Sequence, residues 1–258
     1  MKKSELKIIG ASSTITPEGD STATLHLTRG DKAFLIDCGG NIPALLREQN
    51  LDHTQLDGII ITHSHPDHTY GLPFLSHAFY NGCQKIKLWS VGEALPRLKK
   101  SLEAYDLREE GRYLEVEFKK ISSREPDRIQ LTKEFVVKTL PTNHSRPGVG
   151  LCFQAKNQKI VYSSDTAPAD EIIKAAGNAD VLLHDCQGTE AYSRYFEGSH
   201  TSARRLGKIA RRANVKALVP FHYNTTQIPV TFSELAAEIR EEYNGTIIQA
   251  KKGTAFYL

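Results

Sequence analysis

Short apolar runs rich in β-branched residues recur along the chain and alternate with segments whose apolar positions follow a helical period. Runs of this kind favour buried strands, and the amphipathic segments favour helices that cover them. The predicted strands are residues 6–9, 22–28, 33–37, 58–61, 86–89, 135–140, 150–155, 159–163, 179–184 and 216–221. The predicted helices are one capped at residue 41, those at 71–79 and 93–105, and those after residues 200 and 231. This order predicts an α/β fold.

The length and charge of the chain set further bounds. A chain of 258 residues can bury a sizeable core, and we expect a single domain over residues 1–258. The net charge of +3 is compatible with a phosphate-bearing substrate but does not by itself indicate one. The charged stretch 107–130 is explained equally well by a solvated surface and by a substrate contact.

The cysteines indicate a reducing compartment. Cys38, Cys83, Cys152 and Cys186 are widely separated, and the sequence has no Cys-x-x-Cys pair. Three of them lie in or beside apolar runs, so we expect buried thiols in a cytoplasmic protein. No apolar run approaches the length of a membrane span, and the first residues lead directly into a strand. We therefore expect no membrane anchor and no export signal.

The strand at 58–61 leads into a cluster of metal-ligating residue types, residues 62–68, which read THSHPDH. Imidazole nitrogens and carboxylate oxygens are ligands of zinc and of similar divalent ions. His63 and His65 lie two residues apart and can point the same way from an extended backbone, whereas Asp67 and His68 must face another direction. The motif can therefore supply ligands to two adjacent metal ions.

Four later strands carry further candidate ligands at or just beyond their ends. These residues are His144, Asp165, the pair His184 and Asp185, and His222. A single histidine at a strand end is more often structural than a metal ligand, but four such ends downstream of a metal motif favour a shared site. His26 lies among the polar positions of the strand at 22–28, and we interpret it as structural or exposed.

The motif His-x-His-x-Asp-His resembles the signature of the metallo-β-lactamase superfamily, and the strand-end residues match the other ligand positions of that family. The resemblance covers nearly the whole chain and implies a four-layer αββα sandwich with two divalent ions at one edge, zinc being expected and manganese or iron being alternatives. A hydroxide held between two such ions would be the nucleophile. Asp37, in an Asp-x-Gly turn, would support the metal loop. The implied ligands are His63, His65 and His144 for one ion, Asp67, His68 and His222 for the other, and Asp165 between both.

The sequence around residues 140–166 and the stretch Ser-His-Thr-Ser-Ala at 199–203 resemble the ribonuclease Z branch and its phosphodiesterase relatives. In that branch a histidine matching His200 contacts the scissile phosphate or protonates the leaving oxygen, and an acidic residue, here Asp185, orients it. The resemblance therefore assigns catalysis to Asp67, His200 and Asp185. It implies hydrolysis of a phosphodiester.

Some departures from ribonuclease Z bear on the substrate. Residues 40–43 read Gly-Asn-Ile-Pro where the tRNA-processing enzymes carry a different sequence, Pro66 replaces a glycine, and Asp185 stands in place of a glutamate. The sequence has no long Gly/Pro-bearing insertion that could form a tRNA-grasping arm. The expected substrate is thus either RNA or a small cyclic or nucleotide-like diester, and tRNA is not favoured.

Other classes of function remain open. On the same dinuclear site a lactone, thioester or β-lactam could be hydrolysed, and His200 and Asp185 would then have no leaving alkoxide to protonate. A non-catalytic metal-binding or redox protein is a third class. A homodimer is an expected oligomeric state, and no membrane partner is expected. The helix after His200 is cationic on its polar faces, which fits either a phosphate-facing surface or a solvated one; its cations are Arg204, Arg205, Lys208, Arg211 and Arg212.

Overall fold

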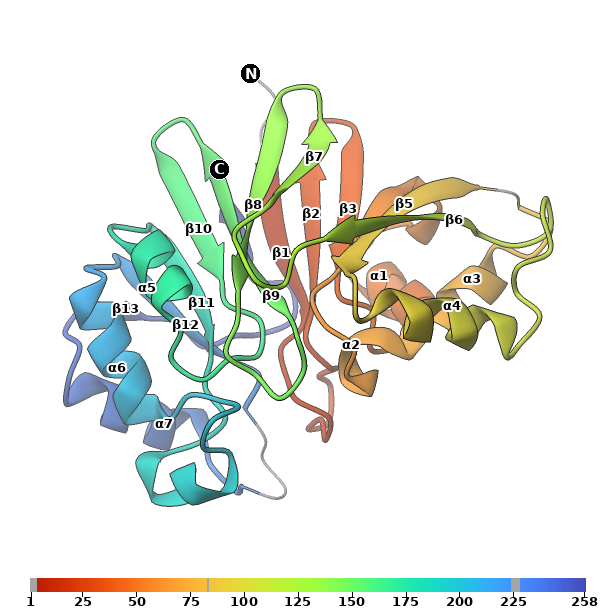
Figure 1. The fold of residues 1–258 in the computed structure, drawn as a ribbon. Helices are drawn as coiled ribbons and strands as arrows, with labels where there is room; N and C mark the ends of the chain where they lie inside the picture. Colours follow the sequence, from red (N-terminus) through yellow and green to blue (C-terminus); the bar gives the residue numbers. More distant parts are fainter. Residues whose placement is uncertain (1–3, 83, 224–227) are drawn as a thin grey trace.

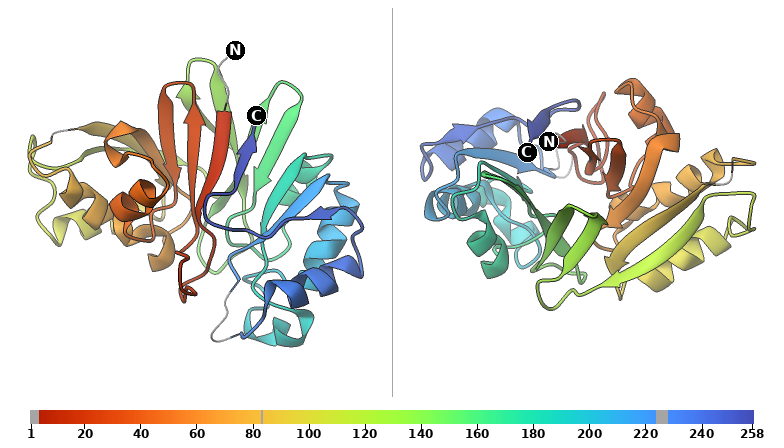
Figure 2. Two further views of the ribbon diagram at one scale, coloured as in Figure 1. Left: turned by 180° about the vertical axis from the view of Figure 1, so that it is seen from behind. Right: turned by 90° about the horizontal axis from the view of Figure 1, so that it is seen from above.

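Two mixed sheets pack face to face between outer helices in the computed structural model, which describes residues 4–82, 84–223 and 228–258 (Figures 1 and 2). Cys83 lies outside these residues. The first sheet has the order β14 (Ala255–Tyr257), β1 (Ser4–Gly10), β2 (Thr24–Arg29), β3 (Lys32–Ile36), β4 (Leu56–Ile61), β5 (Lys85–Val91) and β6 (Glu115–Ile121). The second has the order β13 (Thr246–Ile247), β12 (Ala217–Phe221), β11 (Val181–Asp185), β10 (Gln158–Tyr162), β9 (Val149–Ala155), β8 (Phe135–Pro141) and β7 (Arg128–Thr132).

The helices lie on the outer faces of the two sheets (Figure 2). The first sheet is accompanied by α1 (Ile42–Glu48), η1 (His53–Gln55), α2 (Pro66–Thr69), α3 (Gly71–Ala78) and α4 (Leu95–Glu103). The second is accompanied by α5 (Asp170–Ala176), η2 (Glu190–Tyr195), α6 (Ala203–Arg212) and α7 (Phe232–Arg240). None of the described helices is both long enough and apolar enough to cross a membrane. The predicted αββα arrangement is confirmed.

Parallel pairing brings the ligand-bearing strand ends to one edge of the molecule. In the first sheet β4 is parallel to both β3 and β5, and in the second β11 is parallel to both β10 and β12. Neighbouring parallel strands end on the same side, so Tyr162, Asp185 and Phe221 close β10, β11 and β12 together. The residues that follow these strands therefore meet the loop that follows β4.

The hydrophobic core has two parts. Large side chains between the sheets, such as Phe34, Phe153 and Phe221, are fully buried and belong to one cluster. A second cluster lies between the second sheet and its helices and includes Leu206 of α6 and Leu235 of α7. Burying both faces of each sheet gives the strand ends fixed positions, which a multi-residue metal site requires.

The stretch 107–130 contains more regular structure than its charge suggests. It holds the edge strand β6, which is parallel to β5 and half-buried, and the start of β7. Charged residues alternate along β6, and Lys119 is paired with Glu117 at 2.5 Å. A strand at a sheet edge is partly exposed to water and can carry charged residues. It therefore lacks the apolar run from which a strand is predicted.

Candidate metal centre

The metal loop changes backbone conformation at Pro66, which separates its ligands into two directions. His65 is extended, with φ of −69° and ψ of 149°, and Pro66 begins helix α2. The proline ring fixes a helical φ, so Asp67 and His68 lie in the first turn of α2, whereas His63 and His65 lie on the extended segment before it. This local structure is the one expected from the spacing of the motif.

The first cluster of donor atoms comes from three histidines. His63 Nε2 lies 3.1 Å from His65 Nδ1, and His144 Nε2 lies 3.0 Å from the same atom. His144 comes from the loop after β8 and reaches the metal loop across the two sheets. Asp165 Oδ2 lies 3.7 Å from His63 Nε2 and 3.9 Å from His144 Nε2, which completes a set of four donors.

The second cluster is formed by Asp67, His68 and His222. Asp67 Oδ2 lies 3.2 Å from His222 Nε2 and 3.7 Å from His68 Nε2. All three residues are buried. His222 follows β12, so this cluster also joins the two sheets.

Asp165 lies between the clusters and faces both. Its Oδ2 atom faces the first cluster and lies 3.3 Å from His222 Nε2, and its Oδ1 atom lies 3.4 Å from His68 Nε2. Burial alone would raise the pKa of Asp165, but the facing imidazoles, His222 and His68 above all, hold that pKa well below its usual range. An ionised carboxylate in this position can serve two cations at once.

A buried hydrogen-bond network holds His68 in place. The His68 Nδ1 atom lies 2.9 Å from Asp37 Oδ2, and Asp37 also accepts hydrogen bonds from the backbone and hydroxyl of Thr62. Ser164 donates to the Thr62 hydroxyl at 2.8 Å. Burial alone would lower the pKa of His68, but Asp165 and Asp37 hold it well above its ordinary value. Asp37 therefore leaves Nε2 of His68 free to face the second cluster.

Three residues of the site adopt a left-handed backbone that side chains other than glycine seldom adopt. The φ angles are 61° at Asp37, 54° at Ser164 and 63° at His222. Each lies just after a strand that ends at the site, and each turns the chain sharply. Strain of this kind is concentrated at functional sites, where the surrounding structure maintains it.

The loop after β3 packs directly against the metal loop. The Cys38 amide donates to the His68 carbonyl at 2.8 Å, and the Gly71 amide donates to the Cys38 carbonyl at 2.8 Å. A Cβ atom on Gly39 would lie only 1.6 Å from the Asp67 carbonyl oxygen. Glycine is required at this position because two backbones approach too closely for any side chain.

His200 lies against both clusters, with its ring centroid 4.9 Å from that of His144, and Asp185 holds it there. His200 Nδ1 lies 2.8 Å from Asp185 Oδ2, which also accepts the Thr166 amide at 2.8 Å. The His200 ring stacks on the His222 ring, with centroids 5.5 Å apart and an interplanar angle of 11°. Burial alone would lower the pKa of His200, but the charge and hydrogen bond of Asp185 raise it to about 9.

The arrangement brings every predicted site residue into one region. It also includes residues that the sequence pattern did not identify: Thr62 and Ser164 in the network, and Ser199, whose carbonyl lies 2.8 Å from His144 Nδ1. Each of these adjoins a predicted site residue in the sequence, and that adjacency is the only signal that could have identified them. His26, by contrast, is buried in β2, outside the groups of convergent metal-ligand atoms found among the described residues.

The donor atoms fit divalent metal ions. Two nitrogens that bind one zinc ion at ~2.0–2.1 Å in a tetrahedral arrangement lie ~3.3 Å apart, and the distances of His65 Nδ1 to His63 Nε2 and to His144 Nε2, 3.1 and 3.0 Å, are close to this spacing. His68 Nε2 and Asp165 Oδ1 are buried without a hydrogen-bond partner among the described residues. Buried polar atoms are rarely left without a partner, and bound cations would satisfy both. This chain therefore has the ligands of a divalent metal centre.

The cations of α6 are paired with acids instead of forming an open basic surface. Arg204 contacts Glu241 at 2.8 Å, and Arg211 contacts Glu242 at 3.0 Å. Both glutamates directly follow α7. Arg205 contacts Glu197 at 3.4 Å. These pairs connect α6 to the residues directly after α7 and to the segment after η2, and Arg204 also contacts Glu238 of α7 at 3.7 Å. They account for most of the charge on the helix without a nucleic acid.

Fold and site together define a metal-dependent hydrolase of the metallo-β-lactamase fold. Among solved structures, the metallo-β-lactamase fold protein YhfI from Bacillus subtilis matches with a TM-score of 0.82 and 19% identity over 100% of both chains. Human tRNase Z, short form, matches with a TM-score of 0.77 and 19% identity over 98% of both chains. These similarities show that the chain has the metallo-β-lactamase fold.

Sequence relatives place the chain within this class. Ribonuclease Z of Thermoplasma acidophilum is 26% identical, over 83% of this chain and 84% of its own length. Anti-Pycsar protein Apyc1 of Bacillus phage BSP38 is 30% identical, over 71% of this chain and 77% of its own length. The family model described as Anti-Pycsar protein Apyc1 matches residues 4–240, and the chain belongs to this family. The identification of a ribonuclease Z-like metallo-hydrolase is confirmed.

Proposed function

We propose that the protein hydrolyses a small phosphodiester with two divalent ions, and that RNA is not its main substrate. The observation that carries this proposal is the position of His200, which Asp185 holds against His144 of one ligand cluster and His222 of the other. His200 lines a pocket of about 420 Å³ together with His65 and His144. A volume of this order suits a small ligand.

Two observations favour a small diester over RNA. Phe196, Ile228 and Gln187 line the same pocket as His65 and His144, and its volume of about 420 Å³ suits one small group better than a chain of nucleotides. The cations of α6 are engaged with glutamates, as described above. RNA affinity depends on cations that are free to neutralise phosphates, and α6 supplies few of them.

Each residue of the site would have a distinct role in this reaction. When bound, divalent ions would neutralise the phosphoryl charge and lower the pKa of a water molecule. Asp67, whose Oδ2 atom faces the ligand cluster, would accept the proton of the attacking water on its other carboxylate oxygen. As the new phosphorus–oxygen bond forms and the bond to the leaving group breaks, His200 gives its Nε2 proton to the leaving oxygen. Asp185 holds the imidazole by its other nitrogen and favours the protonated form.

Zinc is the proposed metal, in two ions per chain. Imidazole with one or two carboxylates is a common zinc ligand set, although the same donors also bind manganese and iron. His63, His65, His144 and Asp165 would hold one ion. Asp67, His68, His222 and Asp165 would hold the other.

The experiment that tests the reaction class compares four substrates on metal-reconstituted protein: bis-p-nitrophenyl phosphate, a lactone, a thioester and nitrocefin. Chelator-treated protein is the control. Cleavage of the phosphodiester, lost on chelation and restored by zinc, supports the proposal. Turnover of the lactone, thioester or nitrocefin with an inert phosphodiester would refute it.

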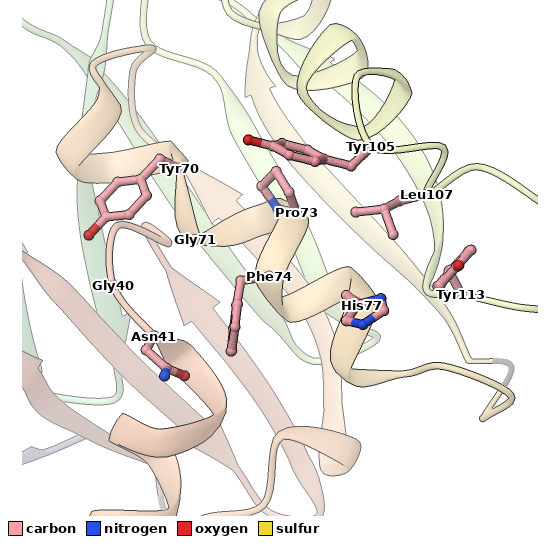
Figure 3. A pocket seen from close by; sticks show the side chains of 10 residues that line it. All are labelled: Gly40, Asn41, Tyr70, Gly71, Pro73, Phe74, His77, Tyr105, Leu107 and Tyr113. Atoms are coloured by element: carbon pink, nitrogen blue, oxygen red, sulfur yellow. The ribbon is translucent and has the colours of Figure 1, made fainter.

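We also propose that two copies of the chain associate through an aromatic groove beside α3. Tyr70, Phe74 and Tyr105 line this groove of about 620 Å³ with exposed fractions of 61%, 53% and 69% (Figure 3). Its ten lining residues include no Asp, Glu, Lys or Arg, so a two-fold contact brings no like charges together. Exposed aromatic patches of this kind mark association sites.

Sedimentation velocity tests the association. A dimer is expected for the parent protein, and Phe74→Glu, which places like charges opposite each other across the two-fold contact, should give monomers. His53→Glu, outside the groove, is the matched control. A parent protein that stays monomeric at micromolar concentration would contradict this proposal without affecting the proposed chemistry.

A cytoplasmic location is proposed from the thiols. The three described cysteines, Cys38, Cys152 and Cys186, are buried and unpaired. Burial raises the pKa of the Cys38 thiol and of the Cys186 thiol, which keeps both protonated. Free thiols persist most readily in a reducing compartment.

A further inference from the structure

The hydroxyl of Thr62 lies between a ligand of the first cluster and the carboxylate that holds a ligand of the second. Thr62 is fully buried and directly follows β4. Its hydroxyl oxygen lies 3.2 Å from His63 Nδ1 and donates to Asp37 Oδ2 at 2.9 Å. His63 belongs to the first cluster, and Asp37 contacts His68 of the second at 2.9 Å. A side chain that is not itself a ligand therefore connects the two clusters.

The hydrogen-bonding capacity of this hydroxyl fixes the direction of each bond. A hydroxyl has one proton to donate and two lone pairs that accept. Ser164 donates to the Thr62 oxygen at 2.8 Å, which occupies one lone pair. The Thr62 proton goes to Asp37, because a carboxylate can only accept. Only a lone pair is left to face His63 Nδ1, so this nitrogen must carry the ring proton.

A proton on Nδ1 leaves the other ring nitrogen of His63 free to bind a metal. A neutral imidazole carries one ring proton, and a nitrogen that binds a metal must be unprotonated. His63 Nε2 lies among the donors of the first cluster, 3.1 Å from His65 Nδ1 and 3.7 Å from Asp165 Oδ2. Asp37 acts in the same way on His68, because it accepts from Nδ1 and leaves Nε2 to face the second cluster.

We infer that Thr62 is a positioning residue, which fixes the protonated nitrogen of His63 and so extends the influence of Asp37 from the second cluster to the first. One buried carboxylate then prepares a ligand in each cluster, directly for His68 and through the Thr62 hydroxyl for His63. Without the hydroxyl, a proton on His63 Nδ1 would be buried with no acceptor, which is unfavourable. The ring would then favour a proton on Nε2, the nitrogen that the metal needs. The inference rests on the proposed dinuclear centre and adds what prepares its first site.

The zinc affinity of each site, measured in variants that keep only one complete cluster, tests this inference. His222→Ala retains the first cluster, His144→Ala retains the second, and competition with a chromophoric chelator gives each Kd. Adding Thr62→Val should weaken zinc binding to the first cluster ~10- to 100-fold, the usual loss for a residue that orients a metal ligand. Binding to the second cluster should weaken by less than about threefold, because Asp37 keeps its contact with His68.

Two further variants separate the hydroxyl from the volume of the side chain. Thr62→Ser keeps the hydroxyl and should restore the affinity of the first cluster. Thr24→Val is the matched control, because Thr24 is also buried and its hydroxyl has no partner among the described residues. It should leave both affinities unchanged. A loss in Thr62→Ser equal to that in Thr62→Val would overturn the role of the hydroxyl.

Nitrogen-15 spectra of the metal-free parent give a measurement that needs no change at residue 62. They are recorded at about pH 8, above the ordinary pKa of a histidine. The His63 signals, identified by their absence in His63→Gln, should show a proton on Nδ1 and none on Nε2. A proton on Nε2 instead would overturn the inference even if Thr62→Val does not fold.

The outcomes distinguish the role of Thr62 from the dinuclear proposal. If the parent binds only one zinc ion, the dinuclear proposal fails and this inference fails with it. If the parent binds two ions and Thr62→Val weakens both sites equally, or neither, the dinuclear proposal stands and the role of Thr62 is wrong.

Discussion

Replacing His200 by alanine tests the proton-transfer role most directly. The His200 side chain hydrogen-bonds to Asp185 and contacts His222 and His144 only through their rings among the described residues. Asp185 keeps its hydrogen bond from the Thr166 amide when the imidazole is removed. The fold and both ligand clusters should therefore survive the change. We expect His200→Ala to retain both metal ions and to lose activity.

The magnitude follows from the role. A positioned general acid contributes ~10²- to 10⁴-fold to a rate, which corresponds to about 3–5 kcal/mol of transition-state stabilisation. The loss should be largest for an alkyl diester, because an alkoxide cannot depart without a proton. With a p-nitrophenyl ester, whose leaving group departs unprotonated, most of the loss should disappear.

The pH profile supplies an independent measurement. Because His200 acts in its protonated form, activity should fall as the pH rises through its pKa, which Asp185 raises. In Asp185→Asn the neutral amide no longer stabilises the imidazolium, so the alkaline limb of kcat should move to lower pH. The loss of rate at neutral pH should be smaller than in His200→Ala, because the hydrogen bond to the imidazole remains available.

The assay is steady-state hydrolysis of an alkyl and a p-nitrophenyl diester, with metal content measured on the same samples. His200→Ala that cleaves the alkyl diester at the parent rate would refute the proton-transfer role. Loss of metal in His200→Ala would instead identify a ligand or a residue needed to build the site.

Three further predictions concern metal, charge and stability. Asp165→Ala should retain less metal than His63→Ala by elemental analysis, because Asp165 faces both clusters; a stoichiometry near one for the parent in excess zinc would contradict the dinuclear proposal. Arg204→Ala combined with Arg211→Ala should lower the melting temperature by loosening α6 from α7 and leave the salt dependence of RNA binding unchanged; a shallower slope would restore an RNA-binding role. Burial and the nearby Lys7 charge lower the pKa of His26 from 6.5 to about 4, so the unfolded chain binds the proton first and this residue should cost about 3 kcal/mol of stability as the pH drops from 6.5 to 4; urea titrations should show a loss smaller by this amount in His26→Leu than in the parent, and equal losses in the two proteins would contradict it.

The sequence by itself determined the class of the site and most of the framework. Strand runs that end in histidine or aspartate are visible without a structure, because apolar periodicity and ligand chemistry are local properties. They predicted the alternating elements, the metal loop of residues 62–68 and the strand-end positions of His144, Asp165 and His222. The edge strand β6 was not predicted from the sequence, because it is only half-buried and its charged residues interrupt the apolar pattern.

Only the tertiary structure showed which residues that are far apart in the sequence lie close together. Only the pairing of parallel strands brings residues 63 and 222 within reach of one carboxylate, and only packing shows that the cations of α6 are engaged with α7. The unpartnered Nε2 atom of His68 and Oδ1 atom of Asp165 likewise depend on residues that are distant in sequence. A hydrogen bond that is absent leaves no mark in a sequence, because whether a polar atom has a partner is a property of the folded chain alone.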